Sequence, residues 1–357
     1  MTELRSGDLV AIQAPPGPAW EERLIAAWEA GAAVMPIDHR LGSAAVAEVI
    51  GRARPTVVES ADSSRQRLDG SPVQDGIGLA IATSGSTGTP ATVLLGRSAL
   101  ETAVKASADR LELNAEPWVC SLPVSHIGGM LVVLRRILLG LEVIYSPDPL
   151  MARDGWASIV PTQLARMTTA GTDLRGHRFL VGGAALAPGL RQSAEDLGAR
   201  VVHTYGMTET SGGVVYDGLP LNGVDIRIGA ASRIELKTPT SASSIRRASG
   251  DVPLATHEGW FTTRDTGHLE EGRLVVTGRM DAVINSGGEK IDPAAVEAAL
   301  TGLPAVRAAT VFSVADEEWG ARMGLRIDAD MTDQEIADFL RSSFGPATKP
   351  VIIERTN

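Results

Sequence analysis

Hydroxyl and glycine residues are concentrated in one short segment, residues 83–90, which reads Thr-Ser-Gly-Ser-Thr-Gly-Thr-Pro. Glycine tolerates positive φ angles and lets backbone N–H groups converge on an anion, while Ser and Thr hydroxyls add uncharged donors. The composition therefore predicts a phosphate-binding loop, with a flexible Ser/Gly linker as the alternative. The candidate phosphate ligands are Thr83, Ser84, Gly85, Ser86, Thr87 and Gly88.

This loop is expected to join two strands. Short apolar runs of the buried-strand type flank it at residues 77–82 and 92–95. A Walker A loop would continue with Gly-Lys-Ser/Thr into a helix, whereas Gly88 is followed here by Thr89 and Pro90. The segment is therefore predicted to be a phosphate loop of another kind.

A second polar segment, residues 204–210, combines one acid with several hydroxyls after a strand candidate. Because Mg²⁺ prefers carboxylate and phosphate oxygens with water, Glu209 beside Thr208 is suited to a magnesium site. An isolated Glu in a loop is more often a solvated surface acid, which is the alternative here.

A third polar segment, residues 260–267, contains Asp265 immediately before Thr266 and Gly267. Its carboxylate could accept hydrogen bonds from two sugar hydroxyls, or simply form a turn. Further polar segments lie at residues 123–126, 181–185, 278–281 and 286–291.

The composition and net charge of the chain restrict the kinds of molecule that it can be expected to bind. The chain has 357 residues, 44% of them hydrophobic and 21% charged, so about two globular domains are expected. A net charge of −10 disfavours nucleic acid or an anionic membrane as the main partner, since either would require a basic face. An anionic cofactor would need local donors.

The single cysteine, Cys120, excludes an intramolecular disulfide and a multi-cysteine zinc site. It lies in an apolar run and is expected to be a buried structural thiol. The N-terminus lacks signal-peptide features, and the longest apolar stretch, residues 127–139, is interrupted by Arg135 and Arg136. No membrane span is therefore expected, and the cytoplasm is the expected location.

Strand and helix patterns alternate through most of the chain. A strand at residues 9–12, a helix from Pro18, a strand at residues 33–36, a helix capped by Ser43 and a strand at residues 56–58 predict a parallel sheet. A capping box of Ser98 and Glu101 is expected to open a helix that runs to Leu111. Further strands are expected at 119–122, 141–145, 158–160, 178–181 and 200–204, with helices at 127–139, 162–168 and 188–197.

After residue 219 the pattern changes to half-exposed alternation at residues 224–228, 232–236 and 273–276, which predicts a small β subdomain. A helix from Pro293, a strand at residues 309–314 and a helix capped by Thr332 and Glu335 follow. The predicted fold is α/β: a large body of doubly wound sheets with a small β subdomain (residues 1–278), then a small α+β domain (residues 279–357).

Taken in order, these polar segments resemble those of the adenylate-forming acyl- and aryl-CoA synthetases. Residues 205–213, Tyr-Gly-Met-Thr-Glu-Thr-Ser-Gly-Gly, followed by Tyr-Asp-Gly-Leu-Pro at residues 216–220, are most similar to the o-succinylbenzoate–CoA ligases of menaquinone synthesis of the actinobacterial type. The similarity covers nearly the whole chain, although longer members carry an additional N-terminal stretch.

The resemblance implies an ATP- and Mg²⁺-dependent ligase that adenylates an aryl carboxylic acid and transfers the acyl group to coenzyme A. It assigns residues 83–88 to the β- and γ-phosphates of ATP, Thr208 to the α-phosphate and Glu209 to magnesium. Both half-reactions pass through anionic states that require fixed donors and a metal.

The other nucleotide and substrate contacts follow from the same resemblance. The nucleotide-binding residues that it implies are Gly183, Ala184, Tyr205 and Gly206 for adenine, and Asp265 with Arg279 for ribose. His126 is implied to position the substrate, although a lone histidine is more often structural. Residues 158–164 are implied to wall the acyl site, with plain core as the alternative, and Asp281 is implied to be the hinge of a mobile C-terminal domain.

Two features depart from the family pattern. Ala91 follows Pro90 where the family usually has lysine, and the sequence stops at Asn357, before the segment in which the family carries its adenylation lysine. Lys349 and Lys290 are the nearest candidates, but both are more typical of solvated surface charges. Slow adenylation is therefore expected.

Three functions remain open on the sequence. The first is the CoA ligase; the second is a degenerate homologue that binds nucleotide or acyl-adenylate without full catalysis; the third is an adenylating enzyme that loads a carrier protein. The sequence also leaves a homodimer open.

Overall fold

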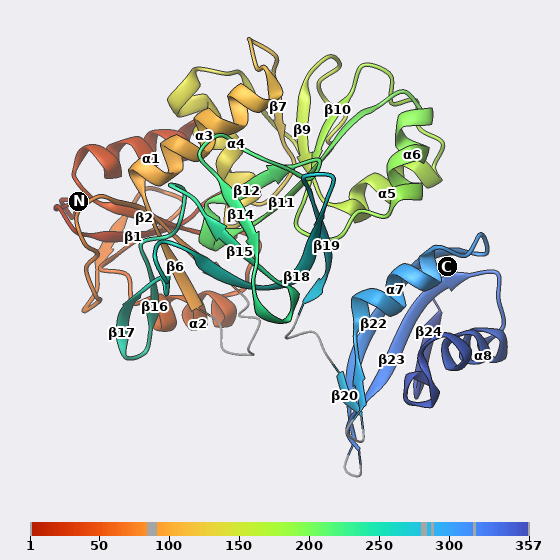
Figure 1. Ribbon diagram of the computed structural model, residues 1–357. Coiled ribbons are helices and arrows are strands. Elements are labelled where there is room, and N and C mark those ends of the chain that lie inside the picture. The colour runs from red at the N-terminus through yellow and green to blue at the C-terminus, as the bar shows by residue number, and fades with distance from the viewer. Residues whose placement is uncertain (1, 84–90, 280–283, 287–288, 317–318, 356–357) are drawn as a thin grey trace. The chain divides into compact units, whose positions relative to one another are not determined.

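The computed structural model describes residues 2–83, 91–279, 284–286, 289–316 and 319–355 (Figure 1). The chain divides into two compact units, Met1–Ile226 with Leu236–Phe261, and Arg227–Glu235 with Thr262–Asn357. The predicted domain boundary between residues 278 and 279 was placed next to the expected hinge, and it stays a prediction.

The first sheet of unit 1 has the strand order β17-β16-β6-β5-β2-β1-β3-β4. Strand β1 pairs in parallel with β2 and with β3, as the alternating pattern predicted, whereas β5 and β6 form an antiparallel hairpin. The predicted phosphate loop therefore does join strand to strand. The elements are β1 (Leu9–Gln13), α1 (Pro18–Glu29), β2 (Ala33–Ile37), α2 (Ser43–Ala53), β3 (Val57–Glu59), β4 (Arg65–Arg67), β5 (Ile77–Thr83), β6 (Ala91–Gly96), α3 (Arg97–Leu111), β16 (Ser244–Arg247) and β17 (Gly250–Pro253).

Two predicted helix caps are wrong. Gly42 precedes α2 and Gly96 precedes α3 at the N-cap positions, and neither helix has a side-chain cap. Strand β6 leads directly into α3, so the helix starts one residue before Ser98. The backbone N–H of Arg97 finds a tertiary partner, the carbonyl of Gly76 at 2.8 Å, which replaces a side-chain cap.

The second sheet of unit 1 has the order β13-β12-β11-β10-β9-β7-β8, in which β8, β7, β9, β10 and β11 are parallel. Strand β11 extends three residues beyond the predicted end at Thr204, because β12 pairs with this extension. The elements are β7 (Trp118–Cys120), α4 (Ile127–Leu139), β8 (Val143–Tyr145), β9 (Trp156–Ile159), α5 (Pro161–Thr169), β10 (Arg178–Val181), α6 (Pro188–Asp196), β11 (Arg200–Met207), η1 (Thr208–Thr210), β12 (Gly212–Tyr216) and β13 (Leu219–Pro220).

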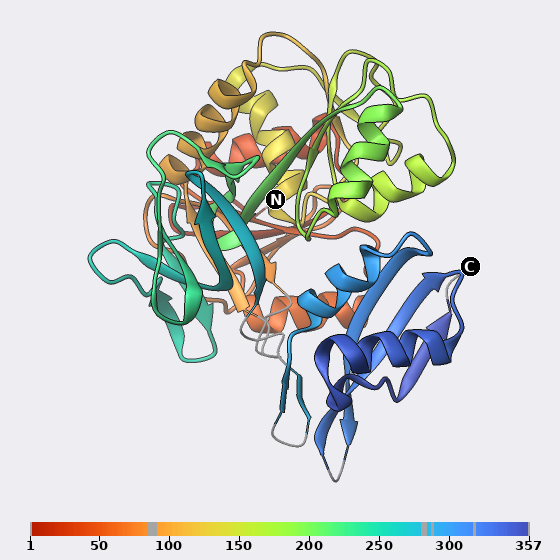
Figure 2. The ribbon, with the colours of Figure 1, turned by 45° about the vertical axis from the view of Figure 1, so that its right-hand side comes forward.

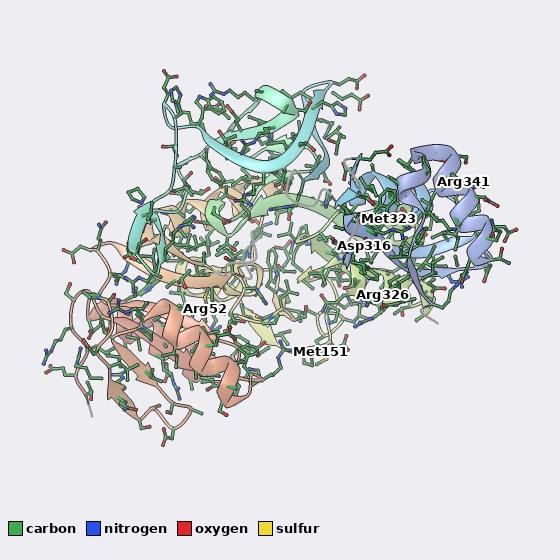
Figure 3. The ribbon with its side chains drawn as sticks, turned by 90° about the horizontal axis from the view of Figure 1, so that it is seen from below. Arg52, Met151, Asp316, Met323, Arg326 and Arg341 are labelled. Atoms are coloured by element: carbon green, nitrogen blue, oxygen red, sulfur yellow. The ribbon has the colours of Figure 1, made fainter. Side chains whose placement is uncertain are left out.

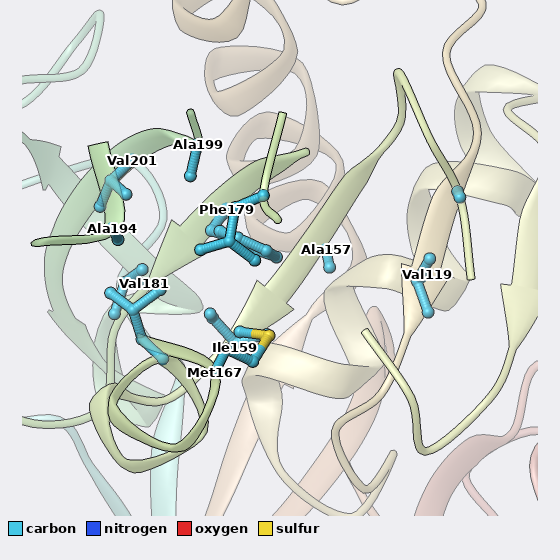
Figure 4. Packing of buried hydrophobic residues seen from close by; sticks show 12 residues of the cluster. Val119, Ala157, Ile159, Met167, Phe179, Val181, Ala194, Ala199 and Val201 are labelled. Carbon is cyan, nitrogen blue, oxygen red and sulfur yellow. The ribbon is translucent and has the colours of Figure 1, made fainter. Parts of the chain in front are cut away.

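One core of this sheet packs β9, β10 and β11 against α5 and α6. Figure 4 shows Phe179 and Val181 of β10 between Ile159 of β9 and Val201 of β11, and all four side chains are at most 2% exposed. Burial of such aliphatic and aromatic side chains is worth about 1.5–3 kcal/mol each before entropy is subtracted. The strand ends that follow these core residues are therefore held on a rigid base.

Unit 2 contains the predicted β subdomain and α+β elements. One sheet has the order β14-β15-β18-β19, and another has β21-β20-β23-β22 with β24 beside β23. Its elements are β14 (Asp225–Ile228), η2 (Ala230–Ser232), β15 (Arg233–Lys237), β18 (Phe261–Glu270), β19 (Arg273–Arg279), β20 (Ile284–Ser286), β21 (Glu289–Ile291), α7 (Pro293–Thr301), β22 (Val306–Asp316), β23 (Gly320–Ala329), α8 (Asp333–Phe344), η3 (Pro346–Thr348) and β24 (Ile352–Arg355).

Both helices of this α+β part pack on its sheet (Figure 2). Val296 and Leu300 of α7, and Ile336 and Leu340 of α8, are fully buried. The predicted capping box at α8 is confirmed: the N–H of Glu335 donates to Thr332 Oγ1 at 3.3 Å, and the N–H of Thr332 donates to Glu335 Oε2 at 2.7 Å.

Charged pairs cover the exposed helix faces. Figure 3 labels Arg341 on α8 and Arg52 on α2. Arg341 pairs with Asp338 at 2.7 Å, and Arg52 pairs with Glu48 one turn earlier. Such exposed pairs contribute little to stability. Within the described residues, no helix combines the length and the apolar character needed to cross a membrane.

Candidate functional site

Seven of the predicted site residues lie at the carboxyl edge of the second sheet: His126, Gly183, Ala184, Tyr205, Gly206, Thr208 and Glu209. Val181 of β10 is in register with Ile159 of β9 and with His203 of β11, so the segments that follow these strands emerge side by side. The N–H of Gly182 donates to the carbonyl of Ile159 at 3.1 Å and extends this alignment past the strand end. The carboxyl edge of a parallel sheet is where α/β proteins bind ligands.

Gly182 and Gly183 need to be glycine for two different reasons. A Cβ at Gly182 would lie 2.4 Å from Thr204 Oγ1, so close packing against β11 excludes a side chain. At Gly183 the nearest atom would be Val160 Cγ1 at 3.7 Å, but φ is +81°, a conformation that favours glycine. Gly183 and Ala184 are exposed, as an adenine contact would require.

Tyr205 and Gly206 lie on the extension of β11, opposite β12. The register shifts between them, and a Cβ at Gly206 would lie 2.1 Å from the carbonyl oxygen of Gly212. The glycines of this motif therefore allow two strands to approach closely. Tyr205 is half-buried beside the bulge.

Thr208 and Glu209 belong to η1, a single 3₁₀ turn that two buried hydroxyls hold in place. Thr210 Oγ1 accepts from the N–H of Met207 at 3.0 Å and donates to the carbonyl of Gly212 at 2.8 Å. Ser211 Oγ donates to the carbonyl of Thr240 at 2.7 Å. Thr210 and Ser211 are 0% exposed, whereas Thr208 and Glu209 are half-buried.

Neither Thr208 nor Glu209 uses its side-chain oxygens in a hydrogen bond with the part of the chain that the structure describes. The turn is rigid, yet its two candidate ligand groups remain available. Among the described residues, no group of three or more His, Cys, Asp or Glu side chains could hold a metal. A magnesium ion here would therefore rely on one carboxylate together with phosphate and water oxygens, which suits its chemistry.

Residues 238–243, which we call the tie segment, connect η1 to the strand that follows the phosphate loop. The N–H of Ala242 donates to the carbonyl of Glu209 at 2.8 Å, and the N–H of Ser243 donates to the carbonyl of Leu94 in β6 at 2.9 Å. Sequence analysis missed this segment, because Thr-Pro-Thr-Ser-Ala-Ser is an unremarkable loop composition. The pairing brings the backbone of Glu209 beside β6.

The phosphate loop itself is only partly described. Thr83 ends β5, and its Oγ1 donates to the carbonyl of Ala91 at 3.2 Å, which closes the hairpin at the base of the loop. The remaining predicted phosphate ligands and the predicted hinge lie outside the described residues: Ser84, Gly85, Ser86, Thr87, Gly88 and Asp281.

His126 is the N-cap residue of α4 and is exposed. Its backbone N–H donates to the carbonyl of Pro123 at 3.1 Å, and its side chain caps nothing. Gly129 permits this turn, since a Cβ there would lie 2.4 Å from the Pro123 carbonyl oxygen. His126 is therefore held at the same sheet edge by a turn that requires glycine at position 129.

Asp265 and Arg279 form an ion pair within unit 2. They are in register on β18 and β19, with Arg279 Nη1 3.0 Å from Asp265 Oδ1. The backbone of Asp265 is fixed because its N–H donates to Thr263 Oγ1 at 3.1 Å. The Asp265 side chain is 6% exposed and that of Arg279 is 44% exposed. The resemblance assigned Asp265 and Arg279 to the same ribose site, and in the structure the two side chains are in direct contact.

Cys120 and the two candidate lysines complete the set of residues that the sequence singled out. Cys120 is buried, and burial raises the pKa of its thiol to about 12, as expected for a structural thiol. Lys349 is exposed after η3 in unit 2. The side chain of Lys290 lies outside the described residues.

The AMP-binding enzyme family matches residues 59–239, about half of the chain. A protein of Mycobacterium tuberculosis (strain ATCC 25618 / H37Rv) named probable 2-succinylbenzoate–CoA ligase is 35% identical over 304 residues, which cover 78% of this chain and 79% of that protein.

Two solved structures share the fold. E. coli MenE with bound OSB-AMS, in variant form, has a TM-score of 0.81 and 25% identity, covering 99% of this chain and 85% of that chain. The o-succinylbenzoate coenzyme A synthetase (MenE) of Bacillus subtilis in complex with ATP and magnesium ion has a TM-score of 0.80 and 22% identity, covering 99% and 86%. The predicted α/β fold is confirmed.

The close pairing of β11 with β12, which glycines permit, and the β5–β6 hairpin at the predicted phosphate loop are consistent with these matches. The chain belongs to the AMP-binding enzyme family, among the adenylate-forming acyl- and aryl-CoA synthetases.

Proposed function

We propose that this protein is an ATP- and Mg²⁺-dependent acid–thiol ligase, which adenylates an aryl carboxylic acid and transfers the acyl group to coenzyme A. The observation that carries the proposal is the η1 turn, which holds Thr208 and Glu209 with unused side-chain oxygens beside β6. The similarity to a named 2-succinylbenzoate–CoA ligase supports o-succinylbenzoate as the acid.

In the first half-reaction a carboxylate oxygen attacks the α-phosphorus of ATP, and pyrophosphate leaves. Thr208 would donate to an α-phosphate oxygen, and residues 83–88 would bind the β- and γ-phosphates. Glu209 would hold Mg²⁺, which neutralises phosphate charge when bound. His126, exposed at the start of α4, would orient the acid.

In the second half-reaction the CoA sulfur attacks the acyl carbon, and AMP leaves. Tyr205 and Gly206, with Gly183 and Ala184, would hold the adenine ring throughout. Asp265 would accept hydrogen bonds from the ribose hydroxyls, with Arg279 keeping its carboxylate in place. Residues 279–357 would move as the C-terminal domain about Asp281, relative to a nucleotide- and acyl-binding domain of residues 1–278.

Ala91, in place of the usual lysine after the phosphate loop, favours a second candidate: a homologue that binds nucleotide or acyl-adenylate without completing catalysis. One assay distinguishes the candidates. The protein is incubated with ATP, Mg²⁺ and a panel of aryl acids that includes o-succinylbenzoate, and both pyrophosphate release and CoA-thioester formation are measured.

Pyrophosphate and thioester formed together would support the ligase. Pyrophosphate release without CoA thioester would favour an enzyme that loads a carrier protein, and nucleotide binding without pyrophosphate release would favour the degenerate homologue.

We also propose a cytoplasmic location, which suits a chain with a single buried cysteine. A homodimer remains a proposal that sedimentation would test.

We expect Asp265→Ala to raise the dissociation constant for ATP. The ribose hydroxyls would lose a charged acceptor worth roughly 1.5–3 kcal/mol, which is roughly a tenfold to hundredfold weaker binding. Calorimetry measures the change, and Asp69→Ala, which removes an exposed acid in unit 1, is the matched control. An unchanged dissociation constant for Asp265→Ala would contradict the ribose assignment.

We expect Ser211→Ala to lower the free energy of unfolding by about 1–3 kcal/mol, because the buried carbonyl of Thr240 loses its donor. The η1 turn would also loosen, so half-maximal pyrophosphate release should need more Mg²⁺. Ser241→Ala is the control, since that half-buried hydroxyl bonds only to Thr238 in its own turn. A destabilised Ser211→Ala with the wild-type Mg²⁺ requirement would show that the tie segment does not position Glu209.

A further inference from the structure

Three elements of unit 1 meet at one buried hydroxyl group, that of Ser107 in α3. Its Oγ accepts a hydrogen bond from Arg135 Nη2 in α4 at 2.8 Å, and another from Tyr216 Oη at the end of β12 at 2.9 Å. All three residues are at most 3% exposed. We call them the Ser107 network, and none of them has a role in the reaction described above.

Arg135 brings a buried positive charge into this network. Its guanidinium lies over the Trp118 ring, 4.0 Å from the ring centroid. Among the described residues, no carboxylate forms an ion pair with it, and its Nε and Nη1 find no hydrogen-bond acceptor. Burial lowers the pKa of the guanidinium, and the neighbouring Tyr216 hydroxyl opposes that shift. A buried charge with so few partners depends strongly on each of them.

The network extends a contact that runs along α4 and β12. A Cβ at Gly212, the first residue of β12, would lie 2.4 Å from Leu131 Cδ1 and 3.8 Å from Ile127 Cγ1. Ile127, Leu131 and Arg135 are spaced one turn apart, so they share one face of α4. That face therefore follows β12 from Gly212 at its start to Tyr216 at its end.

Both elements lead to residues of the proposed reaction. Strand β12 pairs with the extension of β11, where Val215 lies opposite Tyr205, a proposed adenine contact. Helix α4 begins after its N-cap residue His126, which is proposed to orient the acid. The Ser107 network thus joins the strand pair proposed to hold the nucleotide to the helix proposed to hold the acid.

We infer that Tyr216 is a positioning residue for the acid, which acts through the Ser107 network by keeping α4 in register with β12. The inference rests on the proposed ligase function. Without the Tyr216 hydroxyl, α4 would shift more readily along β12, and His126 would occupy its binding position for less of the time. The adenine contacts should change little, because the hydrogen bonds between β11 and β12 hold Tyr205 independently of the network.

Tyr216→Phe removes the hydroxyl and keeps the ring. We expect it to raise the KM for o-succinylbenzoate roughly threefold to tenfold, the net effect of one hydrogen bond, while kcat and the KM for ATP stay at wild-type values. Tyr145→Phe is the matched control, because it removes a hydroxyl that a half-buried tyrosine of β8 donates to Glu21. The control should lower the stability of the protein and leave all three kinetic constants unchanged.

A double variant tests whether Tyr216 acts through Ser107. Ser107→Ala alone should also raise the KM for o-succinylbenzoate, because Arg135 and Tyr216 both lose their shared acceptor. Adding Tyr216→Phe to Ser107→Ala should raise this KM no further, since the two substitutions remove the same hydrogen bond. Additive effects of the two substitutions would contradict the inference.

Hydrogen exchange of the full chain tests the network without relying on activity. In Tyr216→Phe the amides of α4 and β12 should exchange roughly twofold to tenfold faster than in wild type, whereas Tyr145→Phe should leave both at the wild-type rate. A wild-type protein inactive toward every aryl acid would defeat the ligase proposal, and exchange alone would then decide the role of Tyr216. The inference is overturned if α4 exchanges at the wild-type rate in Tyr216→Phe, or if an active protein keeps its KM for o-succinylbenzoate.

Discussion

Glu209→Gln should reduce the rate of pyrophosphate release by about a hundredfold to a thousandfold, the cost of losing a group that stabilises transition-state charge. The substitution keeps the shape of the side chain but removes the charge that Mg²⁺ requires. The η1 turn should survive, because Thr210 and Ser211 hold it and Glu209 contributes only its backbone carbonyl, to Ala242. The rate is measured with saturating ATP and Mg²⁺.

The control for this prediction is Glu22→Gln, which changes an exposed carboxylate on α1 by the same atoms. It should leave the rate and the free energy of unfolding unchanged. Both variants should unfold at wild-type urea concentrations. Pyrophosphate release by Glu209→Gln at the wild-type rate would remove the magnesium assignment.

Arg246→Met should lower the free energy of unfolding by about 3–5 kcal/mol, the range for breaking a buried ion pair from one side. The Arg246 side chain is 2% exposed and binds Asp251 through two bonds of 2.7 and 2.9 Å. It also donates to the carbonyls of Ala53, Ser71 and Pro72 at 3.1, 2.7 and 2.7 Å. Methionine fills a similar volume but leaves all these acceptors without a donor.

Arg247→Met, one residue further along β16, is the matched control. Successive strand residues point to opposite faces, and Arg247 is exposed where Arg246 is buried. The control should change the free energy of unfolding by no more than about 0.5 kcal/mol. Equal effects of the two substitutions in urea denaturation would show that the Arg246 network does not anchor β16.

The structure brings predicted site residues together mainly where they are neighbours in the sequence. Tyr205, Thr208 and Glu209 lie on one strand and the turn that follows it, so a short motif was enough to group them. The hairpin with Thr83 at its base follows in the same way from two apolar runs around a glycine-rich loop.

The predictions that were wrong or missing concern hydrogen-bond and packing partners that lie far apart in the sequence. The caps expected from Ser43 and Ser98 are absent because the tertiary fold supplies other partners, such as the carbonyl of Gly76 for the N–H of Arg97. The close packing that excludes a side chain at Gly182 was not predicted either, since only the packing of β10 beside β11 brings Thr204 against it.

By itself, then, the sequence determined the order of the helices and of the strands from β1 to β11 apart from β4, the β5–β6 hairpin, the motif that contains Glu209 and the resemblance to a family, because each depends on residue types within a few positions of one another. The strands β4, β12, β13, β16, β17, β18, β20, β21, β23 and β24 were not predicted. The tertiary structure alone decided which of two adjacent arginines is buried, which loop ties η1 to β6, and that Glu59 ends beside Arg23 and Arg65. The physical reason is the same in each case. A hydrogen bond such as that from Ser211 to Thr240 joins residues 29 positions apart, and local propensity carries no information about which distant strand will supply the partner.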